Sequence, residues 1–393
     1  MSKYIRKYDS FINRGVNTEI PLPNDIIEIS NAYIKAGKDI FLVGGAVRDF
    51  IQGIKPKDYD LVTNALPNES KEILNKFNVS DEQGKKFGVL RVYTKDEPEG
   101  YEIASYRRDI SGGRDTRGED QKVEMGGGVT IEDDCKRRDL TMNALFYDIK
   151  NKKIVDLVGG VQDIKNGIIR TVGDASKRFS EDRLRICRIF RFAARTGGVI
   201  DPKTSQAIRK DNRLRGISTR EDVSQERIWE EIKKAFKQSK SFIRYLEFFN
   251  QFDMWGEVFP GIDVNKVIKP CKFLTSYMAQ LFEFADLRTL ERKMVIDFRI
   301  EIEIAQKVVF LLRFKEITSV TAFEMYKNFK RCNLSKEELL EWMEVEQLDG
   351  NDFLKFLRYK PSVSSKELMD QGYKGAELGN KIKELEKINF ENL

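Results

Sequence analysis

The sequence predicts an α+β fold in which a sheet-bearing head is followed by a helical remainder. Runs typical of strands are concentrated before residue 150, whereas apolar residues return at helical spacing through most of the chain after it. The length of 393 residues, of which 40% are apolar, is a prior for two or three domains with cores of their own.

The head is expected to begin with a helix and to continue with strands. "NDIIEISNAYIKAG" has a polar start, helical apolar spacing and a closing Gly37, which predicts a capped helix. Strands are predicted at "DIFLVGG", "DYDLVT", "FGVLRVYT" and "GYEIASYR", with a helix at "NESKEILNKF". The glycine-rich, charged stretch between Arg107 and Asp133 predicts a long mobile loop rather than an element.

The rest of the chain is expected to be helical after the hairpin-like "ALFYDIKNKKIVDLV". Helices are predicted at "SEDRLRICRIFRFAART", "SQERIWEEIKKAFKQ", "SFIRYLEFFNQFDMWGEVF", "EIEIAQKVVFLLRF" and "SKEELLEWMEV", and two more in "SSKELMDQGYKGAELGNKIKELEK", joined at Gly372 to Gly375. We expect a head at 22–149, a neck at 150–240, a body at 241–320 and a tail at 321–393.

Composition excludes several kinds of chemistry. The chain contains no histidine, which removes histidine bases, Ser-His-Asp or Cys-His catalysis and histidine-ligated metals. The four cysteines form no CxxC pair, so neither a zinc site nor a disulfide framework is indicated. The net charge of +6 permits a polyanionic partner. No long uncharged apolar run and no signal-like start are present, so a cytoplasmic protein without membrane contact is expected.

Two strand carboxylates, Asp58 and Asp60, indicate a metal site. Residues two apart on a strand share one face, and like charges that close are usually accompanied by a cation. Two Mg²⁺ ions ~3.5–4 Å apart would activate an attacking hydroxyl and hold a triphosphate. Glu102 is the candidate third ligand; the alternative is a glutamate on an exposed strand face.

Gly44 and Gly45 lie where a strand leads into a helix, a place where backbone amides can face a phosphate. Glycine at such a turn can also be purely steric, and Arg48 one turn later is either a phosphate-directed cation or a surface ion pair. In "RRDLTMNALFYD", Arg138, Asp139 and Asn143 offer a phosphate partner, a ribose acceptor and an orienting amide, or simply a basic helix start.

In "SEDRLRICRIFRFAAR", Asp182 and Arg185 are three residues apart and would project from one helix face. An acceptor beside a donor fork fits the amino group and neighbouring ring nitrogen of cytosine or adenine and rejects uracil and guanine. An ordinary intrahelical ion pair is the alternative. Arg188, Arg191 and Arg195 continue a basic stripe that suits an RNA backbone or is merely solvated.

Seven segments together resemble one family. They are "LVGGAVRDFIQGIKPKDYDLVT", "GKKFGVLRV", "YEIASYRRD", "KRRDLTMNALFYD", "DLVGGVQDIKNGIIRTVGD", "FSEDRLRICRIFRFAAR" and "SQERIWEEI". Their order and wording are similar to those of the bacterial-type (class II) tRNA nucleotidyltransferases, the CCA-adding enzymes, and of their poly(A) polymerase relatives. The resemblance covers roughly residues 25 to 240 and implies a polymerase-beta-like nucleotidyltransferase head.

The resemblance implies a role for each matching residue. It implies two metal-binding carboxylates with a third beside them (Asp58, Asp60, Glu102), a triphosphate motif (Gly44, Gly45, Arg48), a ribose and phosphate motif (Arg138, Asp139, Asn143), a base-reading motif (Glu181, Asp182, Arg185), and a scaffolding pair (Glu226, Arg227). The long loop would correspond to the flexible loop thought to switch the pocket from CTP to ATP. A histidine-dependent phosphohydrolase domain is excluded.

The expected activity is template-independent addition of CCA to the 3′ end of tRNA from CTP and ATP, with two Mg²⁺ ions and release of pyrophosphate. Arg188 and Arg191 would add nucleotide or RNA contacts, the body and tail would hold the tRNA acceptor arm, and no obligatory protein partner is evident. The alternatives are a poly(A) polymerase, an enzyme that adds only CC or only A, and a catalytically silent RNA-binding protein.

Overall fold

The computed structural model describes residues 19–80, 88–109, 123–125, 128–214, 223–315, 322–348 and 358–392. The chain divides into two compact units. The first combines Met1–Ser224 with Glu231–Met254, and the second combines Gln225–Glu230 with Trp255–Leu393. The finer division into head, neck, body and tail stays a prediction.

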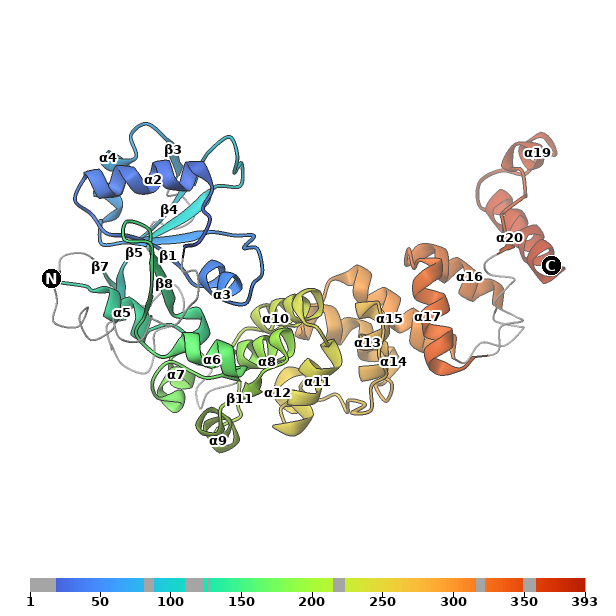
Figure 1. The fold of residues 1–393 in the computed structure, drawn as a ribbon. Helices are drawn as coiled ribbons and strands as arrows, with labels where there is room; N and C mark the ends of the chain where they lie inside the picture. The colour runs from blue at the N-terminus through green and yellow to red at the C-terminus, as the bar shows by residue number, and fades with distance from the viewer. Residues whose placement is uncertain are drawn as a thin grey trace. The chain divides into compact units, whose positions relative to one another are not determined.

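A seven-stranded mixed sheet forms the centre of the first unit (Figure 1). Only the pairing of β2 with β5 is parallel within this sheet, and its other pairs are antiparallel. This confirms the α+β fold class and the strands expected in the head. From one edge to the other the order is β3 (Asn78–Ser80), β4 (Val89–Tyr93), β5 (Tyr101–Ser105), β2 (Asp60–Thr63), β1 (Ile40–Val43), β8 (Leu145–Asp148) and β9 (Lys153–Asp156).

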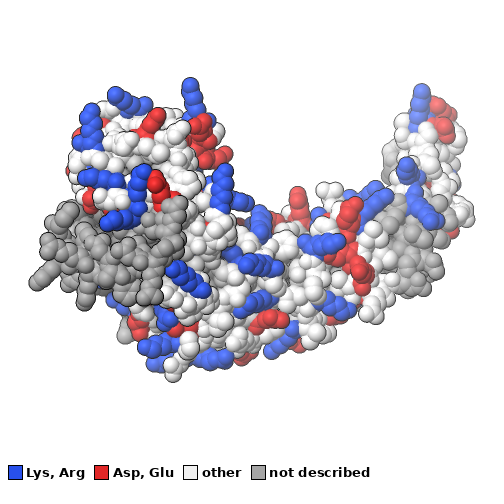
Figure 2. Space-filling model, in the orientation of Figure 1, with Lys and Arg blue, Asp and Glu red and all other residues white. Residues whose placement is uncertain are grey.

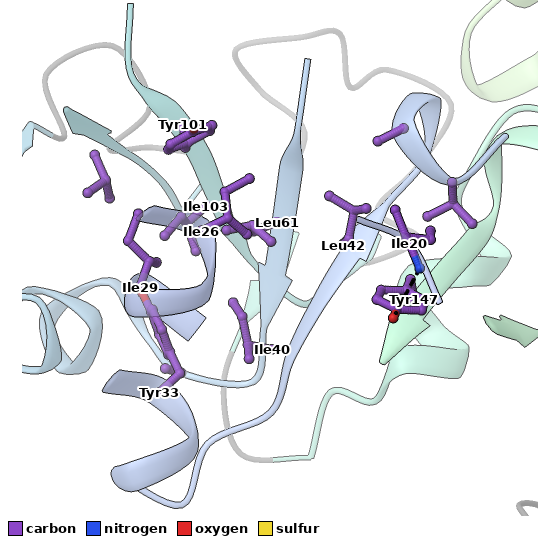
Figure 3. Packing of buried hydrophobic residues seen from close by; sticks show 14 of the residues in the cluster. Ile20, Ile26, Ile29, Tyr33, Ile40, Leu42, Leu61, Tyr101, Ile103 and Tyr147 are labelled. Carbon is purple, nitrogen blue, oxygen red and sulfur yellow. Dashed lines mark hydrogen bonds between the residues drawn. The ribbon is translucent and has the colours of Figure 1, made fainter. Parts of the chain in front are cut away.

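Each face of the sheet has its own apolar core, because successive strand residues point to opposite sides. On one face, Leu42, Leu61 and Ile103 pack against residues of α2 (Asn24–Lys35), as Figure 3 shows. Helices α3 (Gly45–Ile51), α4 (Pro67–Ile73) and α6 (Gly160–Asn166) complete this side.

The other face of the sheet carries a smaller core. Val43, Val62 and Phe146 pack there with Cys135 of α5 (Ile131–Lys136). Asp60 and Glu102 have the same strand parity as Val62 and Ala104, so they belong to this face.

The stretch between Arg107 and Asp133 is not wholly a loop, so that expectation was wrong in part. β6 (Arg107–Asp109) pairs with β7 (Val123–Met125) as an antiparallel ladder, and α5 starts at Ile131. Thr130 caps α5 by accepting a hydrogen bond from the Asp133 amide, a local signal that the charged composition concealed. Residues 110–122 and 126–127 of the expected loop lie outside the described residues.

The helices of the first unit that follow the sheet are α7 (Ala175–Glu181), α8 (Leu184–Thr196), α9 (Pro202–Lys210), the greater part of α10 (Gln225–Gln238) and α11 (Phe242–Gln251). The single helix expected over "SEDRLRICRIFRFAART" is therefore two helices. Two short strands, β10 (Ile168–Ile169) and β11 (Val199–Ile200), also pair in this region, which is thus not entirely helical.

The described residues of the second unit from Trp255 onward form helices and no strand. They are α12 (Trp255–Val258), α13 (Leu274–Leu281), α14 (Leu287–Arg292), η4 (Lys293–Asp297), α15 (Ile302–Phe314), α16 (Ala322–Arg331), α17 (Lys336–Glu346), α19 (Ser365–Asp370) and α20 (Gly375–Glu391). The break at Gly372 to Gly375 is confirmed. Across the described ranges, no helix combines the length and apolarity that crossing a bilayer demands.

Candidate active site

The predicted strand carboxylates meet at one end of the head sheet. β2 and β5 are parallel with Leu61 opposite Ile103, and the same register places Asp60 beside Glu102. On the other side of β2, Asp60 is paired with Val43, the last residue of β1 before the glycine turn. The sheet thus brings together residues from three separate segments of the sequence.

Asp58 lies two residues before β2 and is not part of the strand, contrary to the expectation that both aspartates are strand residues. The three side chains nevertheless alternate in direction as expected. Tyr59 packs against the core that includes α2, and Asp58 and Asp60 are both exposed. The two carboxylates therefore avoid the core while the aromatic residue between them anchors the chain.

The pKa of the Asp60 carboxyl is raised to about 6. Desolvation by the surrounding protein is the largest cause, and the negative charges of Glu102 and Asp58 add to it, whereas Arg138 opposes it. Asp60 keeps an exposed surface, so the desolvation is partial. A bound cation would neutralise these neighbouring negative charges.

Among the described residues, no group of three Asp, Glu, Cys or His side chains lies close enough together to hold a metal ion. The oxygen donors nevertheless suit Mg²⁺, which binds proteins through one or two carboxylates and keeps several waters. Glu102 is engaged by Arg91 of the neighbouring strand. Asp58 and Asp60 are thus the two residues that fit a magnesium ion, with Glu102 within electrostatic reach of Asp60.

The glycine pair forms the turn between β1 and α3. Gly44 has φ 70°, a conformation that side chains other than glycine rarely adopt, and its amide donates to the Leu145 carbonyl at 3.1 Å. Gly45 begins the helix, and a Cβ there would lie 3.6 Å from Arg48. Glycine at 44 is therefore required by the backbone, and phosphate binding at the turn stays a prediction.

Arg48 is buried and does not point a free guanidinium into solvent, so a surface ion pair is excluded. It donates to Asp49 at 2.7 and 2.9 Å and to the Asn143 side-chain oxygen at 2.6 Å, and it stacks on Phe192 at 5.2 Å. In this arrangement Arg48 orients Asn143, and its contact with a phosphate stays a prediction.

The "RRD" segment is held by ion pairs that the sequence did not reveal. Arg138 donates to Asp134 at 2.8 Å and lies over Phe146. Asp139 accepts from Arg188 at 2.7 and 2.8 Å and from the Asn143 amide at 3.3 Å. Burial would raise the pKa of Asp139, but the charge and hydrogen bonds of Arg188 lower it to about 2.

The base-reading residues are arranged differently from the expectation. Asp182 ends α7 in an extended conformation, with φ −155° and ψ 106°, and accepts from the Leu184 amide at 3.1 Å. It does not share a helix face with Arg185. Glu181 is the acid beside Arg185, at 2.6 Å, and Arg185 also donates to the carbonyls of Arg178 and Arg137.

The arginines of the basic stripe of α8 are all held in ion pairs, although Arg188 and Arg195 stay partly exposed. Arg188 pairs with Asp139, Arg191 with Glu231 at 2.6 Å, and Arg195 with Asp49 at 3.2 Å. Arg191 and Glu231 are both buried, and Arg191 also donates to Gln238 at 3.1 Å. The Arg191 guanidinium is thus paired inside the fold in this conformation, and its expected nucleotide or RNA contact stays a prediction.

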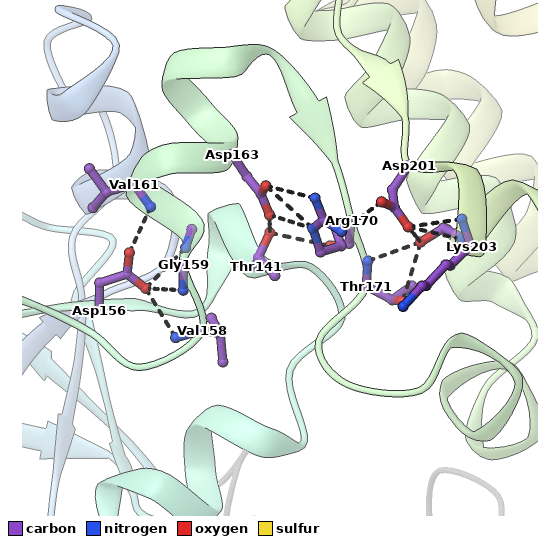
Figure 4. Close-up of polar contacts among 12 residues, drawn as sticks. Thr141, Asp156, Val158, Gly159, Val161, Asp163, Arg170, Thr171, Asp201 and Lys203 are labelled. Carbon is purple, nitrogen blue, oxygen red and sulfur yellow. Dashed lines mark hydrogen bonds and ion pairs between the residues drawn. The ribbon is translucent and has the colours of Figure 1, made fainter. Parts of the chain in front are cut away.

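Polar contacts around helix α6, which Figure 4 shows, connect this helix to Thr141. Asp156 accepts four backbone amides at the start of this helix, from Val158 to Val161, at 2.8 to 3.1 Å. Asp163 accepts from Thr141 at 2.7 Å and from Arg170, and Arg170 reaches Asp201 at 2.6 Å. Thr141 begins the short 3-10 helix η3 (Thr141–Asn143), so this network fixes the turn that carries Asn143.

Sequence reasoning missed Asp134, Glu231 and Asp163, although signals for two of them were present. Asp134 is four residues before Arg138, the spacing of a helical ion pair. Glu231 falls among the buried residues Ile228 and Ile232 of α10, where an unpaired acid would be costly. The partner of Asp163 is set by tertiary structure and leaves no local signal.

Basic residues are also spread widely outside the site. Figure 2 shows Lys and Arg side chains distributed over the face drawn, with Asp and Glu between them. The expected scaffolding residue Glu226 forms an exposed ion pair with Arg299 at 3.1 Å. Such a mixed surface permits a polyanion and does not by itself define a binding track.

Comparison with known proteins finds similarity to one family over part of the chain. Residues 40–170 match the model of the "Poly A polymerase head domain". The chain is 32% identical over 234 residues to a protein named poly(A) polymerase I from Salmonella typhi, covering 58% of this chain and 48% of that protein. It is 41% identical over 180 residues to a protein named CCA-adding enzyme from Ligilactobacillus salivarius, covering 46% of this chain and 42% of that protein.

The sequence matches thus span about half the length of these relatives. A solved structure is similar over more of the chain: the CCA-adding enzyme of Bacillus stearothermophilus in complex with CTP has a TM-score of 0.67 at 23% identity. The likeness covers 94% of this chain and 93% of that one, and it shows a shared fold. The glycine turn, the "DYD" segment and the "RRD" segment all lie inside the range 40–170 that is similar to the poly A polymerase head domain.

Proposed function

We propose that this chain is a nucleotidyltransferase that adds CCA to the 3′ end of tRNA from CTP and ATP. The observation that carries the proposal is the placement of Asp60 beside Glu102, next to the glycine turn of β1, at one end of the head sheet. Relatives named CCA-adding enzyme and CCA tRNA nucleotidyltransferase support the choice of reaction.

The reaction is an in-line displacement in which the tRNA 3′-hydroxyl oxygen bonds to the α-phosphorus of the nucleotide and the bond to the β-phosphate breaks. Asp58 and Asp60, with Glu102 beside them, would hold Mg²⁺. Bound Mg²⁺ supplies acidification of the hydroxyl and neutralisation of the triphosphate charge. Pyrophosphate is released, and no covalent enzyme intermediate is required.

The protein's own polar groups would position the nucleotide. Asn143 is fixed between Arg48 and Asp139, so its amide lies in a defined orientation close to the glycine turn. The base would be read by Glu181, Asp182 and Arg185, of which Glu181 and Arg185 already form an acceptor and donor pair. Cytosine and adenine fit such a pair, and uracil and guanine present the reverse order.

tRNA is the proposed partner, held through its acceptor arm by shape and backbone charge in the second unit. The assignments of neck, body and tail, the cytoplasmic location and the lack of an obligatory protein partner belong to this proposal. Two similar solved structures are CCA-adding enzymes, one in complex with ATP and the other with CTP.

Poly(A) polymerase is the second candidate, because proteins of that name match a longer stretch of this chain, 234 residues against 180. The higher identity of 41% to the CCA-adding relative, against 32%, favours CCA addition. An enzyme that adds only CC or only A would share the same head.

The test uses purified protein and tRNA that lacks its CCA terminus, supplied with CTP, ATP or both, and product lengths are read at nucleotide resolution. CCA addition predicts two residues with CTP alone and three with both nucleotides. Long tails with ATP alone would establish a poly(A) polymerase, and arrest after CC or a requirement for a CC end would establish a partial enzyme.

A catalytically silent RNA-binding protein would give no product at all. Activity that survives unchanged in an Asp58→Ala variant would show that the chemistry lies elsewhere.

A further inference from the structure

Arg91 lies directly opposite Glu102 where β4 and β5 pair. Its guanidinium contacts the Glu102 carboxylate and donates to the Glu99 carbonyl at 3.4 Å. By strand parity the two side chains share the face that carries Asp60. A fixed positive charge is thus attached to a carboxylate of the candidate site.

The fold leaves space for this arginine. Gly100 has φ 81°, and a Cβ at that position would lie 2.5 Å from Cγ of Arg91 and 2.9 Å from the Tyr93 ring. Any side chain at 100 would displace the arginine stem. Gly100 thus both forms the turn between β4 and β5 and leaves the space that the Arg91 stem occupies.

The net charge of the site depends on this contact. Asp58, Asp60 and Glu102 would present three negative charges to a cation, and the negative charge of Glu102 reaches Asp60. With Arg91 bound to Glu102, one of those charges is offset internally. A divalent ion arriving without nucleotide meets a weaker field than three free carboxylates would produce.

We infer that Arg91 is a positioning residue that acts as the internal counter-ion of Glu102 and keeps the affinity of the carboxylate site for free divalent cations low. The ion then binds well only together with the nucleotide, whose phosphates add the missing negative charge. The inference rests on the proposed function, because it requires Asp58 and Asp60 to be metal ligands.

The test measures binding of Mn²⁺ without nucleotide to the full chain, from the decrease in the spin-resonance signal of free Mn²⁺. Arg91→Gln is expected to tighten binding on the order of fivefold, because it frees the Glu102 carboxylate to add its own negative charge at the site. Arg91→Lys should remain close to wild type. Arg288→Gln is the matched control, because it removes one exposed arginine of an ion pair in the second unit.

Coupling between the two residues separates a counter-ion from a general charge effect. In the Glu102→Gln background, Arg91→Gln should no longer tighten Mn²⁺ binding, because the charge that it offsets is gone. Unchanged or weaker binding in Arg91→Gln, with a melting temperature like wild type, overturns the inference. An equal gain in the Glu102→Gln background overturns it too.

Failure of the proposed function has a different signature. It would appear as Mn²⁺ binding by the wild type that persists in Asp58→Ala, or as no saturable binding in any variant with or without CTP. Loss of binding in Asp58→Ala together with an unaltered Arg91→Gln variant would preserve the proposed function and reject only the role of Arg91.

Discussion

Asp60 carries its charge at a cost to the folded protein. Its pKa rises to about 6 from an ordinary value near 4, first through desolvation and then through Glu102 and Asp58. A carboxyl whose folded pKa is raised costs stability above that pKa, and the cost disappears once the pH falls below the unfolded value. Such a cost is typical of a site kept for binding.

Asp60→Asn should therefore stabilise the ligand-free protein at pH 7.5. The expected gain is about 1 kcal/mol after allowance for solvent screening of an exposed group. Thermal unfolding monitored by circular dichroism checks it at pH 7.5 and at pH 3, where the difference from wild type should vanish. A variant that melts lower than wild type at pH 7.5 would argue against this electrostatic description.

The pKa of Asp139 is shifted in the opposite direction to that of Asp60. Arg188 overcomes the effect of burial and lowers the Asp139 pKa to about 2, so the ion pair stabilises the fold above pH 4 and is lost as the pH falls toward 2. Asp139→Asn should cost about 2 kcal/mol at pH 7. Denaturant unfolding at pH 7 and pH 3 measures the cost, which should shrink at the lower pH.

Asp286→Asn is the matched control, since Asp286 forms an exposed ion pair with Arg288 and asparagine can still cap α14. Its effect should be small beside that of Asp139→Asn at both pH values, because water and salt screen an exposed ion pair. Equal costs for the two variants at pH 7 would contradict a special role for the Asp139 pair.

At the element scale, the site depends on how closely α6 approaches η3. A Cβ at Gly160 would lie 2.2 Å from the Thr141 carbonyl oxygen, so only glycine allows this contact. Asp163 on the same helix binds the Thr141 hydroxyl. Sequence periodicity located the head strands and most helices, but this backbone contact has no periodic signature.

Gly160→Ala should therefore cost about 2–3 kcal/mol through overpacking, or shift η3 and weaken nucleotide binding. Thermal unfolding and equilibrium binding of CTP measure the two effects. Gly256→Ala is the control: nothing lies within 4 Å of its Cβ, so it should be neutral or stabilising by up to about 1 kcal/mol. A Gly160→Ala protein as stable as wild type, with unchanged CTP binding, would refute the close contact.

The break between α7 and α8 shows a second limit of sequence reading at this scale. "SEDRLRICRIFRFAAR" has continuous helical periodicity, yet the chain is extended at Asp182. Arg185 and Arg178 donate to carbonyls of Arg137 and Lys136 at the end of α5, and these tertiary contacts favour the break over local propensity. The motif itself could be recognised from the sequence. The pairing of Arg185 with Glu181, and not with Asp182, could not be predicted.

At the scale of the whole molecule, the fold class and the grouping of the site were predictable because they depend on strand order and on motifs. Asp60, Glu102 and the glycine turn converge as the motifs imply. The partners of the α8 arginines were not predictable, because Asp49, Asp139 and Glu231 come from three distant segments. Arginines of α8 that the sequence assigned to ligand binding instead form ion pairs within the first unit.

The central claim is that the carboxylates of Asp58 and Asp60 perform nucleotidyl transfer. It is tested most directly by the single-turnover rate of the first CMP addition to tRNA lacking CCA, with Asp58→Asn and Asp60→Asn compared with wild type and Arg288→Gln. The account predicts losses of about a thousandfold or more in both aspartate variants, with folding retained and an unchanged rate in the control. Rates within tenfold of wild type in either aspartate variant would contradict it.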